Sequence, residues 1–164
     1  MLQCAVKRGR LVILLVEDGV NDIYFVRPAT QAGGAGHRVC GVNNGEEAIA
    51  YLKGEGRFAD REKYPLPNVV LTDLKMPGMG GFEILHWLRS NPRYAVIPTL
   101  VYSNSHLESD VQEAYRLGAN SYIAKPTSIK DMVDILHLLY QYWSRCETPR
   151  VPANSEPAVS ATRG

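Results

Sequence analysis

The chain has 164 residues, of which 45% are hydrophobic and 21% are charged, and its formal net charge is +1. This length allows one domain with a full hydrophobic core and is too short for two ordinary ones. The near-zero charge gives no general attraction to nucleic acid or to an acidic membrane, so neither is expected as a partner. The three cysteines, Cys4, Cys40 and Cys146, have no metal-ligand spacing, which favours a reducing cytoplasm over a disulfide framework.

Short apolar segments with strand character recur along the chain. The first, over residues 11–16, follows three basic residues but is too short for a signal peptide or a membrane span. Four more are expected at 38–42, 69–71, 99–102 and 121–124. All but the second are almost continuously apolar, which is typical of parallel strands that are covered on both faces.

Helical patterns lie between these strands. The first, over 22–32, contains Pro28, which predicts a kink or an early end. Asn44 and Glu47 predict a capping box for a helix through residue 52. Three more helices are expected: one around 84–88 that ends near Asn91-Pro92, one from a Ser105/Glu108 cap to Gly118, and one over 129–143 capped by Ser128 and Asp131.

The strict alternation of strands and helices predicts an α/β fold. We expect a doubly wound, five-stranded parallel sheet in the flavodoxin-like order 2-1-3-4-5 with five helices, over residues 9–146. The charged connection over 54–67 is expected to be a solvated loop. Residues 147–164 are rich in Pro, Ser, Ala and Thr and are predicted to form a disordered tail, with no room for an output domain.

Acidic residues follow the first and third predicted strands. Glu17 and Asp18 come directly after the first strand, and Asp73 follows the third. The carboxyl ends of these strands are neighbours in the predicted sheet, so the three carboxylates would repel one another unless a divalent cation neutralised them. Because oxygen-only ligands favour Mg²⁺, we predict a magnesium site there.

Two further strand ends complete this edge of the sheet. The fourth strand leads to the hydroxyl of Ser103, and the fifth leads to the ammonium group of Lys125. A carboxylate beside a metal, a hydroxyl and a positive charge can accept a phosphoryl group. Asp73 is therefore the candidate phosphoacceptor, and Lys125 and Ser103 would balance the phosphoryl charge.

These residues resemble the receiver domains of response regulators, a family that includes the bacterial chemotaxis regulator. The likeness covers residues 11–143, and its offsets of 30 from Asp73 to Ser103 and 22 from Ser103 to Lys125 are those of the family. Its motifs are Val16-Glu17-Asp18, Leu71-Thr72-Asp73-Leu74-Lys75-Met76-Pro77, Ser103 and Tyr122-Ile123-Ala124-Lys125-Pro126. The segment from Gly45 to Pro67 is further similar to single-domain regulators that partner bacterial phytochrome-type sensor kinases.

The resemblance implies a role in a two-component phosphorelay. Asp73 would take a phosphoryl group from a sensor histidine kinase in a Mg²⁺-dependent reaction in the cytoplasm, with no enzymatic activity beyond its own phosphorylation and dephosphorylation. Asp18, Asp73 and the backbone carbonyl of Lys75 would ligate Mg²⁺, with Glu17 acting directly or through water.

The resemblance also implies how the signal would leave the site. Lys125, followed by a cis peptide bond to Pro126, would pair with the phosphoryl group. Ser103 would follow that group, and Tyr122 would swing inward behind it, which makes these two residues the predicted switch.

Three positions depart from the family pattern. Gly80 replaces the usual Asp after the Met-Pro pair and is expected to affect only a turn, while Pro28 is expected to alter the surface where a kinase would dock. Lys75 brings a long cationic side chain near the path of an attacking water, and we hypothesise that it influences the lifetime of the phosphoryl group.

Other interpretations remain open from the sequence. A dehalogenase-type phosphatase would need a second Asp where Lys75 stands, and a flavin-binding domain would need a phosphate cradle where the chain has Glu17 and Asp18. A receiver-like module that binds partners without phosphorylation is the remaining alternative. Tyr140, Tyr142 and Trp143 are interpreted as helix packing, or alternatively as the seam of a homodimer.

Overall fold

A computed structural model describes residues 11–19 and 38–151 of the chain. Five strands form one parallel sheet in the order β2-β1-β3-β4-β5, which confirms the predicted order. The strands are β1 (Val12–Val16), β2 (Arg38–Val42), β3 (Val69–Thr72), β4 (Thr99–Ser103) and β5 (Ser121–Ala124). β3 and β4 each extend one residue beyond the range that the sequence indicated, so their last residues lie at the site edge.

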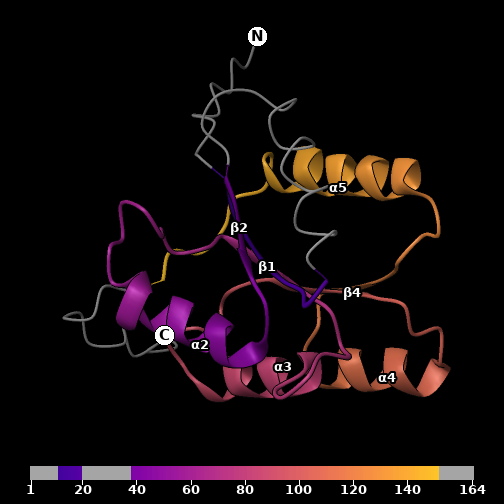
Figure 1. Ribbon diagram of the computed structural model, residues 1–164, viewed down its shortest axis with the longest axis horizontal. Helices are drawn as coiled ribbons and strands as arrows, with labels where there is room; N and C mark the ends of the chain where they lie inside the picture. Colours follow the sequence, from indigo (N-terminus) through magenta and orange to yellow (C-terminus); the bar gives the residue numbers. More distant parts are fainter. Residues whose placement is uncertain (1–10, 20–37, 152–164) are drawn as a thin grey trace, which may run out of the picture.

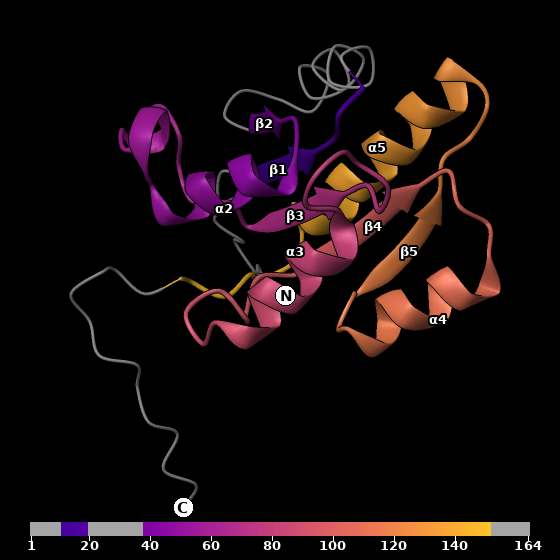
Figure 2. The ribbon, with the colours of Figure 1, turned by 60° about the horizontal axis from the view of Figure 1, so that its bottom comes forward.

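Within the described residues the chain forms four α-helices and one 3-10 turn. They are α2 (Gly45–Lys53), α3 (Gly81–Ser90), α4 (Glu108–Arg116), α5 (Ile129–Trp143) and the turn η1 (Gly56–Phe58). The helix predicted over 22–32, with Pro28, lies outside the described residues. Figures 1 and 2 show α5 on one face of the sheet and α2, α3 and α4 on the other.

The three central strands, β1, β3 and β4, are buried along their whole length, as their continuous apolar sequences predict, whereas the edge strands β2 and β5 are mostly half-buried. All five residues of β1 are buried, and their side chains alternate between the two faces. Ile13 and Leu15 pack with Leu136 of α5, whereas Leu14 and Val16 pack with Ile84 of α3. The two apolar layers hold the strand ends in a fixed register, so residues that follow neighbouring strands must meet.

Two of the three predicted N-cap residues cap their helices, although the capping box at Asn44 is incomplete, because the Glu47 carboxylate accepts from the backbone of Asn43 and not from that of Asn44. The side chain of Asn44 accepts a hydrogen bond from the Glu47 backbone at 2.8 Å, and Ser128 accepts one from Asp131 at 3.0 Å. The predicted cap at Ser105 is wrong, because α4 starts after Leu107, which makes no side-chain cap. The Ser105 side chain instead bonds to the carboxylate of Asp110, inside the first turn of that helix.

The connection over 54–67 is packed rather than fully solvated. The Arg61 guanidinium donates to the carbonyl groups of Tyr51 at 2.8 Å and Leu52 at 2.7 Å, near the end of α2. Phe58 is buried, and its ring lies 5.2 Å from those of both Tyr51 and Tyr64. Despite its many charged residues, this loop therefore contains an aromatic cluster that holds it against α2.

The segment after α5 contacts the amino-terminal end of the central strand β3. The side-chain amide of Asn68 donates to the hydroxyl of Thr148 at 3.0 Å, and Val151 packs against the core beneath α2 and α3. Of the predicted tail, residues 152–164 lie outside the described residues. In the part of the chain that the structure describes, no helix has the length and apolar character needed to cross a membrane.

Candidate functional site

Three carboxylates meet where β1 and β3 end. Val16 pairs with Thr72 across these neighbouring strands, so Glu17, Asp18 and Asp73 follow at the same edge of the sheet. One carboxylate oxygen of each lies within 4.8 Å of the others. Glu17 and Asp73 are buried, whereas Asp18 is exposed. The predicted convergence of these acids is confirmed, and it leaves one side open to water.

The side chain of Lys125, which follows β5, extends past the end of β4 to the acids that follow β1 and β3. The backbone N–H of Lys125 donates to the carbonyl of Ser103 at 2.9 Å. Its ammonium group donates to a carboxylate oxygen of Asp73 at 2.8 Å and also to Glu17. No peptide bond in the described residues is cis, so the expected cis bond before Pro126 is a wrong prediction. The trans bond nevertheless leaves Lys125 directed into the site.

Glu17 and Lys125 each influence the pKa of the other. Burial raises the pKa of Glu17 above its usual value, and the hydrogen bond and charge of Lys125 oppose that rise only in part. Burial also disfavours the charge on Lys125, but the combined hydrogen bonds and charges of Asp73 and Glu17 outweigh it. The pKa of Lys125 is therefore raised, and the site keeps its ammonium group protonated at neutral pH.

The carboxylate of Asp73 is held from both sides. One oxygen accepts from the backbone N–H groups of Leu74 at 2.5 Å and Lys75 at 3.3 Å, and the other accepts from Lys125. Such contacts fix the direction of a nucleophile before any substrate arrives. A side chain at Gly81 would collide with the carbonyl of Asp73, so the start of α3 closes tightly on the end of β3.

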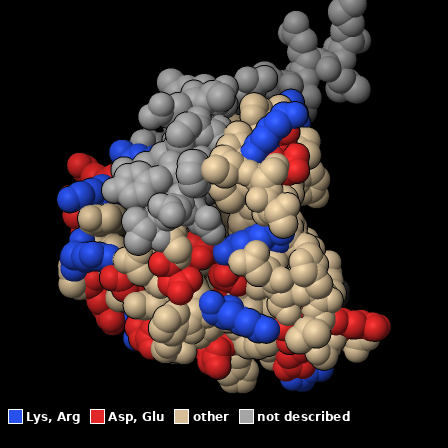
Figure 3. All heavy atoms as spheres, turned by 45° about the vertical axis from the view of Figure 1, so that its right-hand side comes forward, with Lys and Arg blue, Asp and Glu red and all other residues tan. Residues whose placement is uncertain are grey.

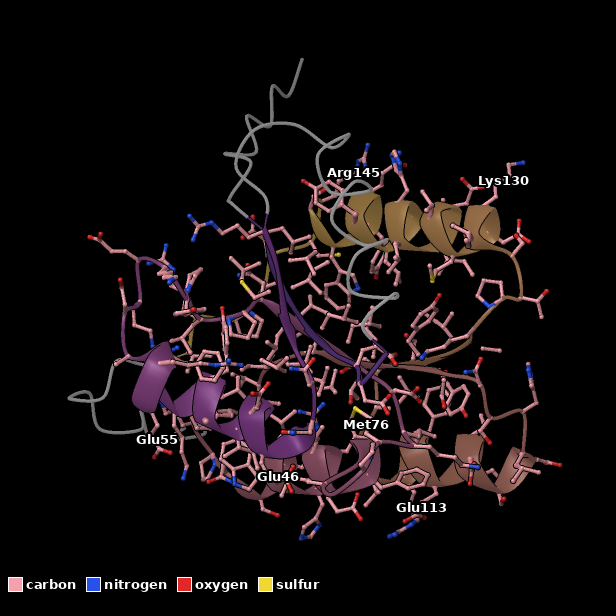
Figure 4. All side chains as sticks on the ribbon, viewed as in Figure 1. Glu46, Glu55, Met76, Glu113, Lys130 and Arg145 are labelled. Atoms are coloured by element: carbon pink, nitrogen blue, oxygen red, sulfur yellow. The ribbon has the colours of Figure 1, made fainter. Side chains whose placement is uncertain are left out.

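The loop between Asp73 and α3 is tied to α2. Glu46, labelled in Figure 4, accepts a hydrogen bond from the backbone of Met79 at 3.1 Å, and the carbonyl of Met79 accepts from Gly45 at 3.1 Å. Gly78 has a φ of 76°, a conformation that favours glycine. The backbone of Met79 thus makes two hydrogen bonds to α2, one with a side chain and one with the backbone.

The donor set fits a hard divalent cation. Three carboxylates and one ammonium group leave a formal charge of −2 among these four side chains. Figure 3, which brings this edge of the sheet forward, shows acidic and basic side chains gathered side by side on the molecular face. Because all the available ligand atoms are oxygens, the arrangement favours Mg²⁺ or Mn²⁺ over softer metals.

Comparison with known proteins identifies the family. The sequence model of the family described as the response regulator receiver domain matches residues 13–137. The chain belongs to this family. It is therefore a receiver domain of the two-component type, whose members act as signal transducers rather than as metabolic enzymes.

Similar receivers include two response regulators whose names refer to phytochrome or to red light signalling. Response regulator Rcp1 of Synechocystis sp. is 34% identical over 142 residues, which cover 87% of this chain and 93% of Rcp1. The Mn²⁺-bound structure of Rcp1 aligns with a TM-score of 0.74 over 87% of this chain and 99% of that one. The phosphorylated cyanobacterial phytochrome response regulator RcpA, at 32% identity, gives 0.80 over 87% and 100%. RPA3017, in red light signalling of R. palustris, is 29% identical and gives 0.77 over 85% and 99%.

The two predicted switch residues of this receiver lie near each other beside the acids. Ser103 is buried at the end of β4, and its side chain accepts from the backbone of Ser105 at 3.4 Å. The hydroxyl of Tyr122 donates to the carbonyl of Ser105 at 2.8 Å. Burial chiefly raises the pKa of Tyr122, so its hydroxyl keeps the proton that makes this bond. Ser105 therefore connects both predicted switch residues, which the sequence did not indicate.

The side chain of Lys75 makes an ion pair with α4. Its ammonium group lies 3.6 Å from a carboxylate oxygen of Asp110 in α4. Sequence reasoning missed Asp110, since it lies in a helix and belongs to none of the strand-end motifs. The predicted metal contact of the Lys75 carbonyl stays a prediction.

Proposed function

We propose that this receiver accepts a phosphoryl group on Asp73 from a phosphohistidine of a sensor kinase. A carboxylate oxygen of Asp73 would attack phosphorus, forming an O–P bond while the P–N bond breaks and the histidine nitrogen takes up a proton. The observation that carries this proposal is the arrangement of Asp73, which is buried, oriented by two backbone N–H groups and paired with Lys125.

Mg²⁺ belongs to the same proposal. Glu17, Asp18, Asp73 and the carbonyl of Lys75 would hold it, and the bound ion would neutralise charge on the phosphoryl oxygens. Lys125 would then exchange its hydrogen bond to Asp73 for one to the phosphoryl group. Ser103 would donate its hydroxyl to the same group, and Tyr122 would follow through Ser105.

The side chains around Asp73 support a receiver over a phosphatase. A phosphatase of the dehalogenase type needs a general acid two residues after its nucleophile, and Lys75 stands there with its side chain directed to Asp110. Reactions at Asp73 would then be limited to the receiver's own phosphorylation and the hydrolysis of its acyl phosphate.

The partner that we propose is a phytochrome-type histidine kinase in the cytoplasm. RcpA and RPA3017 support this choice, because they are named for phytochrome and for red light signalling. A homodimer through α5 is a further part of the proposal. Tyr140 is buried, as packing predicts, but Leu138 and Tyr142 are 65% and 62% exposed and offer an apolar surface.

The test is labelling of the purified chain with acetyl phosphate and Mg²⁺, followed by mass spectrometry of the modified peptide. We expect one phosphoryl group on Asp73 and none in Asp73→Asn. Asp134→Asn, which removes an exposed carboxylate from α5, should label as the wild type does. A folded wild-type chain that labels neither with acetyl phosphate nor with phosphorylated candidate kinases would favour a binding module that works without phosphorylation.

A further inference from the structure

One carboxylate joins the loop after β3 to the loop after β4. The Oδ2 atom of Asp110 accepts a hydrogen bond from the Ser105 hydroxyl at 2.5 Å and lies 3.6 Å from the ammonium group of Lys75. The side chain of Asp110 is only 18% exposed, whereas that of Lys75 is 67% exposed. Asp110 is thus fixed in its place, while its cationic partner is free to move through water.

Ser105 carries this connection further into the receiver. Its backbone N–H donates to Ser103, and its carbonyl accepts from Tyr122. A continuous series of contacts therefore runs from Lys75 through Asp110 and Ser105 to Tyr122. A change at the Lys75 end would alter the support of the loop that holds the tyrosine hydroxyl.

Lys75 has a second anion within its surroundings. Its backbone N–H lies 3.3 Å from a carboxylate oxygen of Asp73, so its long side chain starts beside the phosphoacceptor. A phosphoryl group carries about one to two negative charges at neutral pH. Because an exposed ion pair contributes little net free energy, the present contact with Asp110 is easily exchanged for another.

We propose that Asp110 is a positioning residue that couples the charge on Asp73 to the first turn of α4 by competing with the phosphoryl group for Lys75. The inference rests on the proposed phosphorylation of Asp73. While Asp73 is unmodified, Asp110 holds Lys75 and ties α4 to the loop after β3. Once the phosphoryl group draws Lys75 away, Asp110 keeps only Ser105, and the tie between the two loops is lost.

The test measures the affinity of the full chain for beryllium fluoride, a non-covalent phosphoryl mimic, with Mg²⁺ present. Titration is followed by the amide NMR signal of Leu74. Asp110→Asn keeps an oxygen for Ser105 but removes the charge that competes for Lys75, so binding should tighten about two- to five-fold. In a Lys75→Met background the same substitution should have no effect. Glu108→Gln, which removes a charge from the same helical turn, should leave the affinity unchanged.

A second measurement separates this role from a merely structural one. In unliganded Asp110→Asn and Lys75→Met, the amide signals of Ser105 and Tyr122 should already be shifted towards their beryllium fluoride-bound positions. Lys75→Arg, which keeps the ion pair, should leave them where the wild type has them.

Three results would overturn the inference. Equal affinities of wild type and Asp110→Asn would do so, as would the same gain in the Lys75→Met background. If Asp73 labels normally while either of these is found, only the coupling fails and the proposed function stands. If the wild type neither binds beryllium fluoride nor labels with acetyl phosphate, the coupling and the proposed function fail together.

Discussion

The ammonium group of Lys125 lies 2.8 Å from a carboxylate oxygen of Asp73, although β5 and β3 are separated by β4 in the sheet. The side chains of both residues are less than 10% exposed, and Glu17 shares the same cation. One buried positive charge therefore pairs with acids that follow two other strands. Its removal should lower the stability of the folded state even when no phosphoryl group is present.

We expect Lys125→Ala to lower the free energy of unfolding by about 2–3 kcal/mol in metal-free buffer, because it leaves Glu17 and Asp73 buried without a counter-charge. Exposed Asp18 gives water access to the site, which keeps the loss below that of a fully enclosed pair. Urea unfolding measures it. Lys130→Ala, an exposed substitution in α5, should change stability by less than about 0.5 kcal/mol, and an equal loss in both variants would contradict the prediction.

Mg²⁺ should stabilise the folded receiver. At a concentration one hundred times its dissociation constant, a ligand that binds only the folded state adds about 2.7 kcal/mol. Asp18→Asn removes one of the three carboxylates and should weaken Mg²⁺ binding about ten-fold or more, seen as a smaller rise in Tm and by calorimetry. Glu113→Gln, on the exposed face of α4, should bind Mg²⁺ as the wild type does. Wild-type affinity in Asp18→Asn would remove this residue from the proposed ligand set.

The phosphoryl group on Asp73 should be lost faster when Lys75 is shortened. A cation that turns towards the phosphoryl group stabilises its charge and obstructs an attacking water, so Lys75→Ala and Lys75→Asn should accelerate hydrolysis by a few-fold to about ten-fold. The rate is followed as loss of label in the presence of Mg²⁺. Unchanged rates in both variants would dispose of the hypothesis that Lys75 influences phosphoryl lifetime.

Tyr51 should make stability depend on alkaline pH. Its buried hydroxyl donates to the carbonyl of Pro65 at 2.8 Å, so Tyr51→Phe should cost about 1 kcal/mol at neutral pH. Burial, followed by the nearby Cys40, raises the pKa of Tyr51 above its ordinary value of 10.0. The unfolded chain therefore ionises first, and the stabilising effect is complete below pH 10 and declines above it.

The measurement is urea unfolding of both proteins between pH 8 and about pH 11. The advantage of the wild type over Tyr51→Phe should shrink as the pH rises through the unfolded-state pKa of Tyr51. An advantage that stays constant or grows with pH would contradict the sign of this prediction.

Much of the fold and site could be predicted from local sequence. Strands buried on both faces appear as uninterrupted apolar runs, and the order of the sheet then brings the residues that follow them to one edge. Glu17, Asp73 and Lys125 were predictable for this reason, since their positions depend only on where three strands end.

Side-chain partners chosen by tertiary packing were not predictable. Ser105 and Glu108 have the spacing of a helix cap, but Asp110 provides a charged partner for Ser105, and the helix starts later. Lys75 gave no sign of its contact with Asp110, because the two residues lie in separate elements. Arg61 likewise gave no sign of its bonds to α2, since a charged loop that packs against a helix has the same composition as one that does not.

The close approach of Gly81 to the carbonyl of Asp73 fixes the backbone of the phosphoacceptor on one side, the side of α3. On that side the two backbones lie so close that there is no room even for a methyl group on Gly81. The end of β3 therefore cannot move towards α3. Towards α4 the loop after β3 makes an apolar contact, in which Leu74 packs in the same buried cluster as Ala114, and one charged contact through the solvent-facing side chain of Lys75. A movement caused by added charge on Asp73 is therefore expected on the α4 side, where an exposed ion pair has to separate, rather than on the α3 side, where two backbones are in contact.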